Sequence, residues 1–170
     1  MTVSLHSFVG MYRRDLATLA HLLAKGAAFA ESRGESGGDM LGWRLADDMN
    51  PMAFQFAVAI NFINGWTARI ADEPMPEAIV GADLDVAGFE AAIAQSSAFL
   101  DSITADKVAG RDDVAITFKI GEIMEPTLPA EQWITGFATT NIHFHLSMVY
   151  AILRMKGAPL GKIDLFPNGL

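Results

Sequence analysis

Apolar residues recur along much of the chain at steps of three and four, the spacing that places them on one face of a helix. The first such set is Phe8, Tyr12, Leu16, Leu19 and Leu23. It predicts an amphipathic helix over about residues 5–30. The stretch ESRGESGGD follows, and its glycines, together with Ser and Asp side chains that compete for local hydrogen bonds, predict a mobile loop.

A second helix is predicted over residues 51–71, where apolar side chains occur almost all round the helix and indicate deep burial. Asp48 or Asn50 can cap it, and Pro51 stands in its first turn, where a missing amide proton costs nothing. The motif DEPMP ends this helix, because each proline holds the preceding residue away from helical angles.

Two more helices are predicted in the second half of the chain. Asp85 can cap the third helix. Its apolar stripe consists of Val86, Phe89, Ile93, Leu100 and Ile103. The fourth helix is expected to begin near Ala130 and to run to about Met155, with Gly157 as its stop signal.

The segment between the last two predicted helices has a different pattern. Ile116, Phe118 and Ile120 alternate with polar residues before Gly121, which predicts a small β-hairpin. The fold class is therefore predicted to be all-α. We expect one domain over residues 1–170, a four-helix bundle with long crossover connections and a small β-hairpin before the last helix.

Composition narrows the function classes. The chain has 12 basic and 20 acidic residues with no basic patch, which argues against nucleic acid as a partner. It has no cysteine, so a metal site must use histidine, carboxylate or amide oxygen. The hydrophobic content of 51% and mean hydropathy of +0.28 are high for a monomer of this size and suggest a homodimer.

Nothing in the sequence indicates a membrane protein. The N-terminus lacks a basic segment followed by a long apolar stretch. The most hydrophobic segment, MAFQFAVAINFI, is short and contains Gln55 and Asn61. We expect a soluble, cytoplasmic protein.

The motif NIHFH places His143 and His145 two residues apart in the fourth predicted helix. Such residues point about 200° apart around a helix axis, so the pair cannot grip one metal ion. The inner stripe is predicted to be Ile134, Ala138, Asn141, His145, Met148 and Ile152. His145 is then expected to face inward, and His143 outward or toward a neighbouring helix.

Gln55 interrupts the most apolar segment and falls on a line with Met52, Ala59, Phe62 and Trp66. It is therefore expected to meet Asn141 and His145 inside the bundle. Two interpretations stay open: a hydrogen-bond network that sets helix register, or a small-ligand pocket between the second and fourth helices. The candidate ligand-binding residues are Gln55, Trp66, Asn141, His145 and Tyr150. Arg154 could pair with Asp164.

Several patches of the sequence resemble a known family. WRLADDM, a following Gln, NIHFH, YAILR and GAPLGKID are similar to the DinB/YfiT-like superfamily of bacterial four-helix proteins, most closely a branch of uncharacterised DinB-like domains. In the metal-holding members, the resemblance implies three histidine ligands. His145 matches one of them, while Asn141 and Gln55 stand at the other two places.

Neutral amides bind first-row divalent ions more weakly than imidazole does. The resemblance therefore implies at most a weakly bound divalent metal, zinc or nickel, at His145, which Asp48 could assist. Three functions stay open: a small-ligand-binding protein, a metal-dependent thiol transferase or hydrolase with His145 as ligand or general base, and a homodimeric structural or interaction protein.

Overall fold

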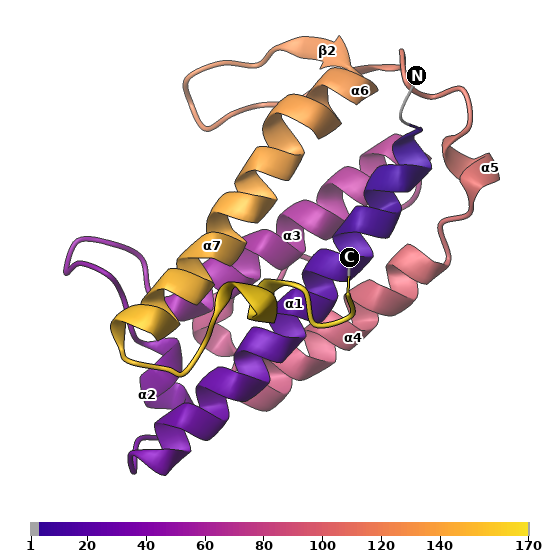
Figure 1. The fold of residues 1–170 in the computed structure, drawn as a ribbon. Helices are drawn as coiled ribbons and strands as arrows, with labels where there is room; N and C mark the ends of the chain where they lie inside the picture. Colours follow the sequence, from indigo (N-terminus) through magenta and orange to yellow (C-terminus); the bar gives the residue numbers. More distant parts are fainter. Residues whose placement is uncertain (1–3, 170) are drawn as a thin grey trace.

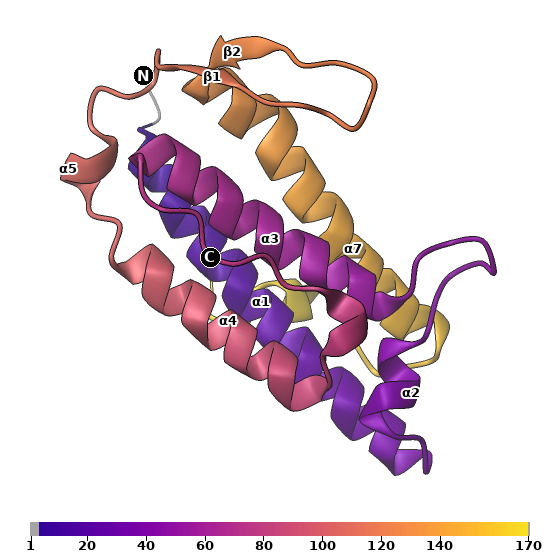
Figure 2. The same ribbon diagram turned by 180° about the vertical axis from the view of Figure 1, so that it is seen from behind.

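A computed structural model describes residues 4–169 (Figure 1). Four long helices form a bundle: α1 (Leu5–Ser32), α3 (Met52–Ala71), α4 (Val86–Asp101) and α7 (Thr139–Met155). They surround the core in the cyclic order α1, α4, α3, α7, and α1 also contacts α3 across the bundle. α1 and α7 run in one direction and α3 and α4 in the other, so long connections cross the bundle (Figure 2). The predicted all-α bundle with crossover connections is confirmed.

The predicted ends of the long helices agree with the structure to within about two residues; at α3 only the capping residue differs. Asp85 caps α4 as expected, because its Oδ1 accepts a hydrogen bond from Gly88 N at 2.8 Å. At α3 the N-cap residue is Pro51 and no side chain caps the helix. The expectation that Asp48 or Asn50 would do so is therefore wrong.

The glycine-rich loop predicted after α1 contains a short helix, α2 (Gly37–Leu41). Ser36 and Asp39 form a capping box that satisfies the first amides of α2, while Met40 and Leu41 are buried. The prediction of a mobile loop failed because burial of these two side chains and reciprocal capping outweigh the conformational freedom of the glycines.

A hairpin precedes the last helix, as predicted. Strand β1 (Ala115–Thr117) pairs antiparallel with β2 (Thr127–Pro129), and a bridge joins Ile120 to Met124 nearer the tip. The second strand lies later in the chain than the alternating pattern suggested. Three further short helices are η1 (Gly81–Asp83), α5 (Ala105–Val108) and the 3-10 helix η3 (Lys162–Leu165).

The last helical run has a feature that the sequence pattern did not predict. α6 (Ala130–Gln132) leads into η2 (Trp133–Ala138), a π-helical segment that continues directly into α7. A π turn holds about one residue more than an α turn, so it advances the register of every later side chain. The buried residues of α7 are Ile142, Leu146, Val149, Ile152 and Leu153.

Over residues 141–149 this register differs by one residue from the predicted inner stripe. Asn141, His145 and Met148 lie half-buried at the border of the core, and the residue after each of them is buried. The prediction that they face the bundle axis is therefore wrong. Ile134 and Ala138, within the π segment, and Ile152, near the end of α7, are buried as expected.

The C-terminal segment is fastened to α1 through Asp164. This carboxylate is 7% exposed and binds Lys25 Nζ at 2.6 Å, His21 Nε2 at 2.8 Å and Gly161 N at 2.7 Å. The hydrogen bond from the Lys25 ammonium contributes most to holding the pKa of Asp164 far below its usual range. Arg154 instead donates to the Ala158 carbonyl oxygen, so the expected Arg154–Asp164 pair is not formed.

Within residues 4–169, none of the helices combines the length and apolar character needed to cross a membrane.

Candidate functional site

Gln55 and His145 meet between α3 and α7. Nδ1 of His145 lies 2.7 Å from Oε1 of Gln55, and Nε2 of Gln55 donates to the Asn50 carbonyl oxygen at 3.1 Å. Gln55 is buried, whereas His145 is half-buried. The loop before α3 thus orients the glutamine amide, and the amide orients the imidazole ring.

These contacts define which imidazole nitrogen carries the proton. The Gln55 nitrogen must donate to the Asn50 carbonyl, so its oxygen faces His145, and an amide oxygen can only accept. Nδ1 of His145 is therefore the N–H donor, and in the neutral ring Nε2 keeps its lone pair. Burial lowers the pKa of His145, which favours this neutral form near pH 7.

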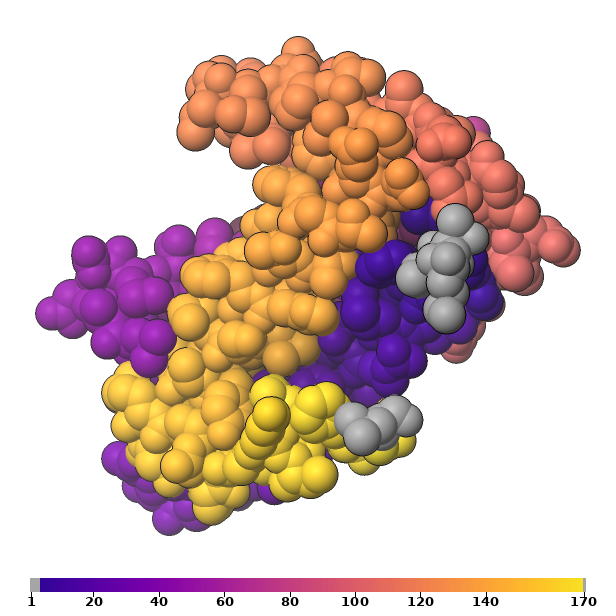
Figure 3. Space-filling view, turned by 45° about the horizontal axis from the view of Figure 1, so that its top comes forward, coloured from indigo at the N-terminus to yellow at the C-terminus, as the bar shows by residue number. Residues whose placement is uncertain are grey.

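Two partly exposed aromatic rings stand beside His145. Phe54 and Phe144 meet the imidazole edge-on, with ring centroids at 6.0 and 5.2 Å, and are 39% and 54% exposed. The 42–51 loop and the hairpin project on the same side of the molecule, and the outline is notched between them beside α7 (Figure 3). An oriented acceptor in an apolar, accessible setting suits recognition of a small molecule.

The other predicted site residues do not join this pair. Asn141 turns to its own helix, where Nδ2 donates to the Phe137 carbonyl oxygen at 2.7 Å. Tyr150 is half-buried against the core. Trp66 lies 11 residues after Gln55, about 16 Å along α3. It is buried in an aromatic cluster, where its ring stacks on Trp133 at 5.1 Å.

The donor set at His145 does not fit a three-histidine metal centre. Among the described residues, no three His, Asp or Glu side chains are grouped closely enough to hold a metal ion. The Gln55 oxygen is already engaged by Nδ1 of His145, and Asp48 is exposed on the loop before α3. His145 therefore offers a single nitrogen ligand.

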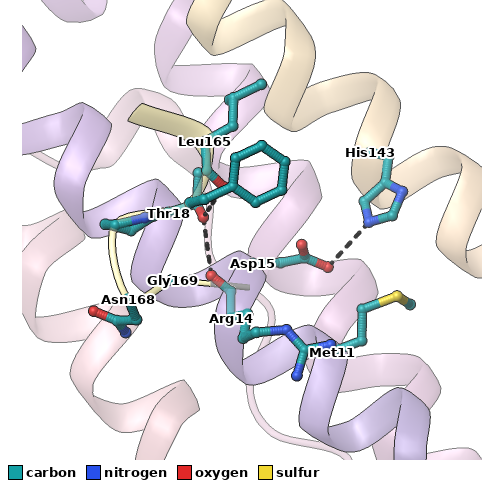
Figure 4. Close-up of a pocket in the computed structure, with 10 residues that line it drawn as sticks. Met11, Arg14, Asp15, Thr18, His143, Leu165, Asn168 and Gly169 are labelled. Atoms are coloured by element: carbon teal, nitrogen blue, oxygen red, sulfur yellow. Dashed lines mark hydrogen bonds and ion pairs between the residues drawn. The ribbon is translucent and has the colours of Figure 1, made fainter. Parts of the chain in front are cut away.

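His143 faces α1, on the other side of α7 from His145. Its Nε2 lies 3.4 Å from Oδ2 of Asp15, a buried oxygen that receives no hydrogen bond within residues 4–169. The pair borders a cavity of about 310 Å³ between α1, α7 and the C-terminal segment (Figure 4). The prediction that His143 points outward or to a neighbouring helix is confirmed.

This pair predicts a pH-dependent contribution to stability. Asp15 raises the pKa of His143 above its ordinary value, so the contribution is complete below about pH 6.5 and is lost as the pH rises through the raised pKa. Because His143 is about half exposed, we expect less than about 1 kcal/mol.

The measurement compares the unfolding free energies of the parent protein and Asp15→Asn by denaturant titration. The difference should be larger near pH 5.5 than near pH 8.5, roughly one unit below and two above the ordinary histidine pKa. Arg14, which also borders the cavity, stays charged across this range and so does not produce the trend. A difference that grows with pH would contradict the prediction.

Sequence reasoning missed Asp15 and Arg69, which border the cavities and have partners on other elements. Asp15 lies on α1 and meets α7, and Arg69 on α3 reaches the hairpin, where its guanidinium covers Phe118 at 4.8 Å. Both contacts join positions more than 40 residues apart, and no local pattern signals them. The four-residue spacing of Gly65 and Arg69 was the one readable hint, since glycine leaves room for a side chain one turn later.

Comparisons with known proteins agree with the fold. Residues 5–166 match the family described as a domain of unknown function, DUF1993. The crystal structure of a DinB family member protein from Shewanella denitrificans is similar, with a TM-score of 0.85, 23% identity, and coverage of 95% of this chain and 91% of that chain. No curated protein matches significantly. The predicted DinB-like resemblance is confirmed; at this identity the structural likeness concerns the fold alone.

Proposed function

The chain belongs to the DUF1993 family, and we propose that it binds a small, partly apolar molecule between α3 and α7 that donates a hydrogen bond to Nε2 of His145. The observation that carries the proposal is the 2.7 Å contact between Gln55 and Nδ1 of His145. It leaves Nε2 as an acceptor, and Phe54 and Phe144 offer apolar surface beside it.

The bound molecule has defined chemistry under this proposal. A hydroxyl or N–H group would pair with the lone pair of Nε2, and an apolar body would cover the two phenylalanine rings. The same nitrogen could act as a general base toward that group, because a neutral imidazole accepts protons near pH 7. Binding thus requires only the lone pair of Nε2 and the two rings. Proton transfer also requires a substrate whose donor group reaches Nε2.

A titration followed by long-range ¹H–¹⁵N NMR of the histidine rings tests the proposal. Phenol, which carries a hydroxyl, should shift the Nε2 resonance of His145, whereas anisole, which lacks the donor, should not. Gln55→Leu should remove the preference for a proton on Nδ1 and weaken phenol binding by roughly fivefold to tenfold, the value of one hydrogen bond.

His145→Ala should abolish the response, and His6→Ala, on the first turn of α1, is the matched control that should retain it. Equal shifts with phenol and anisole would refute recognition through Nε2. Zinc and nickel are titrated in parallel: we expect dissociation constants no tighter than millimolar, as a single imidazole ligand implies. Micromolar affinity that depends on His145 would instead favour the metal-dependent enzyme.

Pairing of two copies is a second candidate function for the same face. Phe54, Phe144 and Met155 are between 39% and 54% exposed on α3 and α7. Burial of such side chains would stabilise a dimer. Light scattering at high protein concentration checks this: a dimer that Phe144→Ser dissociates supports pairing, and a monomer counts against it.

A further inference from the structure

A second cavity, of about 260 Å³, lies beside the C-terminal half of α3. Gln55 lies near the N-terminal end of the same helix. Its walls come from three segments: α3, the connection that follows α3, and the hairpin. The lining is largely apolar and aromatic, with Phe62, Trp66 and Phe118 as the rings and Met75 and Pro76 from the connection.

Arg69 is the charged residue among those that border this cavity. Its guanidinium lies over the rings of Trp66 and Phe118, with the central carbon 5.3 and 4.8 Å from the ring centroids. Within residues 4–169 it forms no ion pair with a carboxylate; its polar contact is a long one of 3.9 Å, to Met75 Sδ. Burial lowers the pKa of Arg69, as expected for a cation without a nearby counter-charge.

The cavity wall is held in place before any ligand arrives. Asn61 fixes the connection to α3 through two hydrogen bonds with the backbone of Ile79, both at 2.9 Å. Gly65 leaves room for the guanidinium, since a Cβ there would lie 2.9 Å from Arg69 Nη1. Asn64, which also lines the cavity, has a buried Oδ1 that receives no hydrogen bond from the described residues. Such preorganisation lowers the entropic cost of binding.

From this arrangement we infer a second binding site, which takes a small aromatic carboxylate: Arg69 pairs with the carboxylate, and the rings of Phe62 and Phe118 with Met75 contact the aromatic body. Stacking occupies the face of the guanidinium and leaves its N–H edge for a bidentate pair with carboxylate oxygens. The volume suits a molecule with one ring.

A carboxylate fits this site better than a phosphate. One guanidinium balances one negative charge, and a phosphate group at neutral pH carries about 1.5 to 2. The lining offers no further cation, and the chain carries a net charge of -8 that repels polyanions. The inference is independent of the proposed function, because it uses neither Gln55 nor His145.

The test titrates the full chain with phenylacetate, its uncharged analogue phenylacetamide and inorganic phosphate. Binding is followed through the side-chain Nε–H resonance of Arg69 and the indole N–H of Trp66. We expect both resonances to shift with phenylacetate and to shift far less with the other two. Phosphate binding more tightly than phenylacetate, or equal binding of the amide, would overturn the inference.

Three variants locate the interaction. Arg69→Gln should weaken phenylacetate binding by roughly tenfold or more, since a charge-assisted hydrogen bond is lost. Gly65→Ala keeps the charge but displaces the guanidinium, so a several-fold loss is expected while the helix itself gains stability. Arg69→Lys, which keeps the charge without the planar fork, should fall between the parent protein and Arg69→Gln.

The matched control is Arg44→Gln, which makes the same change of charge on an exposed loop residue. It should bind phenylacetate as the parent protein does. An equal loss of phenylacetate affinity in Arg44→Gln and Arg69→Gln would show that net charge alone drives binding, and would overturn the inference. His145→Ala should leave phenylacetate binding unchanged, so this result and the phenol result are separable.

Discussion

Trp133→Ala is expected to lower the free energy of unfolding by about 3–5 kcal/mol, the usual cost of removing a large aromatic side chain from a core. Trp133 is 1% exposed and stacks on Trp66 with ring centroids 5.1 Å apart. Its indole N–H also donates to the Ile116 carbonyl oxygen at 2.8 Å, which ties the hairpin to the bundle.

Denaturant titration followed by far-UV circular dichroism measures this effect, and Trp133→Phe separates its two parts. The phenylalanine variant keeps most of the packing and loses the hydrogen bond. It should therefore cost clearly less than alanine, although it leaves the Ile116 oxygen without its donor. Phe144→Ala, at an exposed position of α7, is the control and should change stability by less than about 1 kcal/mol. A small loss for Trp133→Ala would show that the aromatic cluster is not part of the cooperative core.

Gly81→Ala should destabilise the protein by about 1–3 kcal/mol or more, as overpacking against a rigid neighbour does. A Cβ at this position would lie 2.4 Å from the Ala53 carbonyl oxygen and 2.9 Å from its carbon. Both are backbone atoms of α3, so no side chain can rotate to make room. The 3-10 helix η1 would have to move away from α3. The connection before η1 would move with it, and this connection carries Ala78, which lines the same cavity as Arg69.

Gly10→Ala provides the matched comparison, because the same substitution is made where space is open. Gly10 lies within α1, and a Cβ there would meet no atom within 4 Å. Alanine should stabilise this helix by roughly 0.5–1 kcal/mol. Relative to the parent protein, the midpoint temperature of thermal unfolding should fall for Gly81→Ala and rise for Gly10→Ala. A rise in stability for Gly81→Ala would mean that η1 does not pack against α3 as closely as described.

The sequence pattern predicted the long helices well because each carries its own apolar face and local stop signals, such as Gly157 after α7. It missed α2, where the capping box of Ser36 and Asp39 and the burial of Met40 outweighed a glycine-rich composition. It also missed the second hairpin strand. A three-residue strand bears too few alternating positions to be recognised without its partner.

The candidate site was predicted in part. Gln55 and His145 were expected to meet, and they do, because a polar residue in an otherwise apolar helix needs a buried partner. Asn141 was expected beside them and bonds its own helix instead. The π segment before α7 accounts for the error: its wider turn displaced positions 141–148 by one residue, and the residue spacing gave no sign of it.

The amino-acid order alone determined which segments coil, where they end, and which polar side chains interrupt apolar faces, since these follow from short-range periodicity and capping. Tertiary packing alone decided the rest. It brought Asp15 to His143, Arg69 to Phe118 and Asp164 to Lys25. Each pair joins distant positions, and the free energy of such a contact depends on how whole helices align, a quantity that no local stretch of sequence contains.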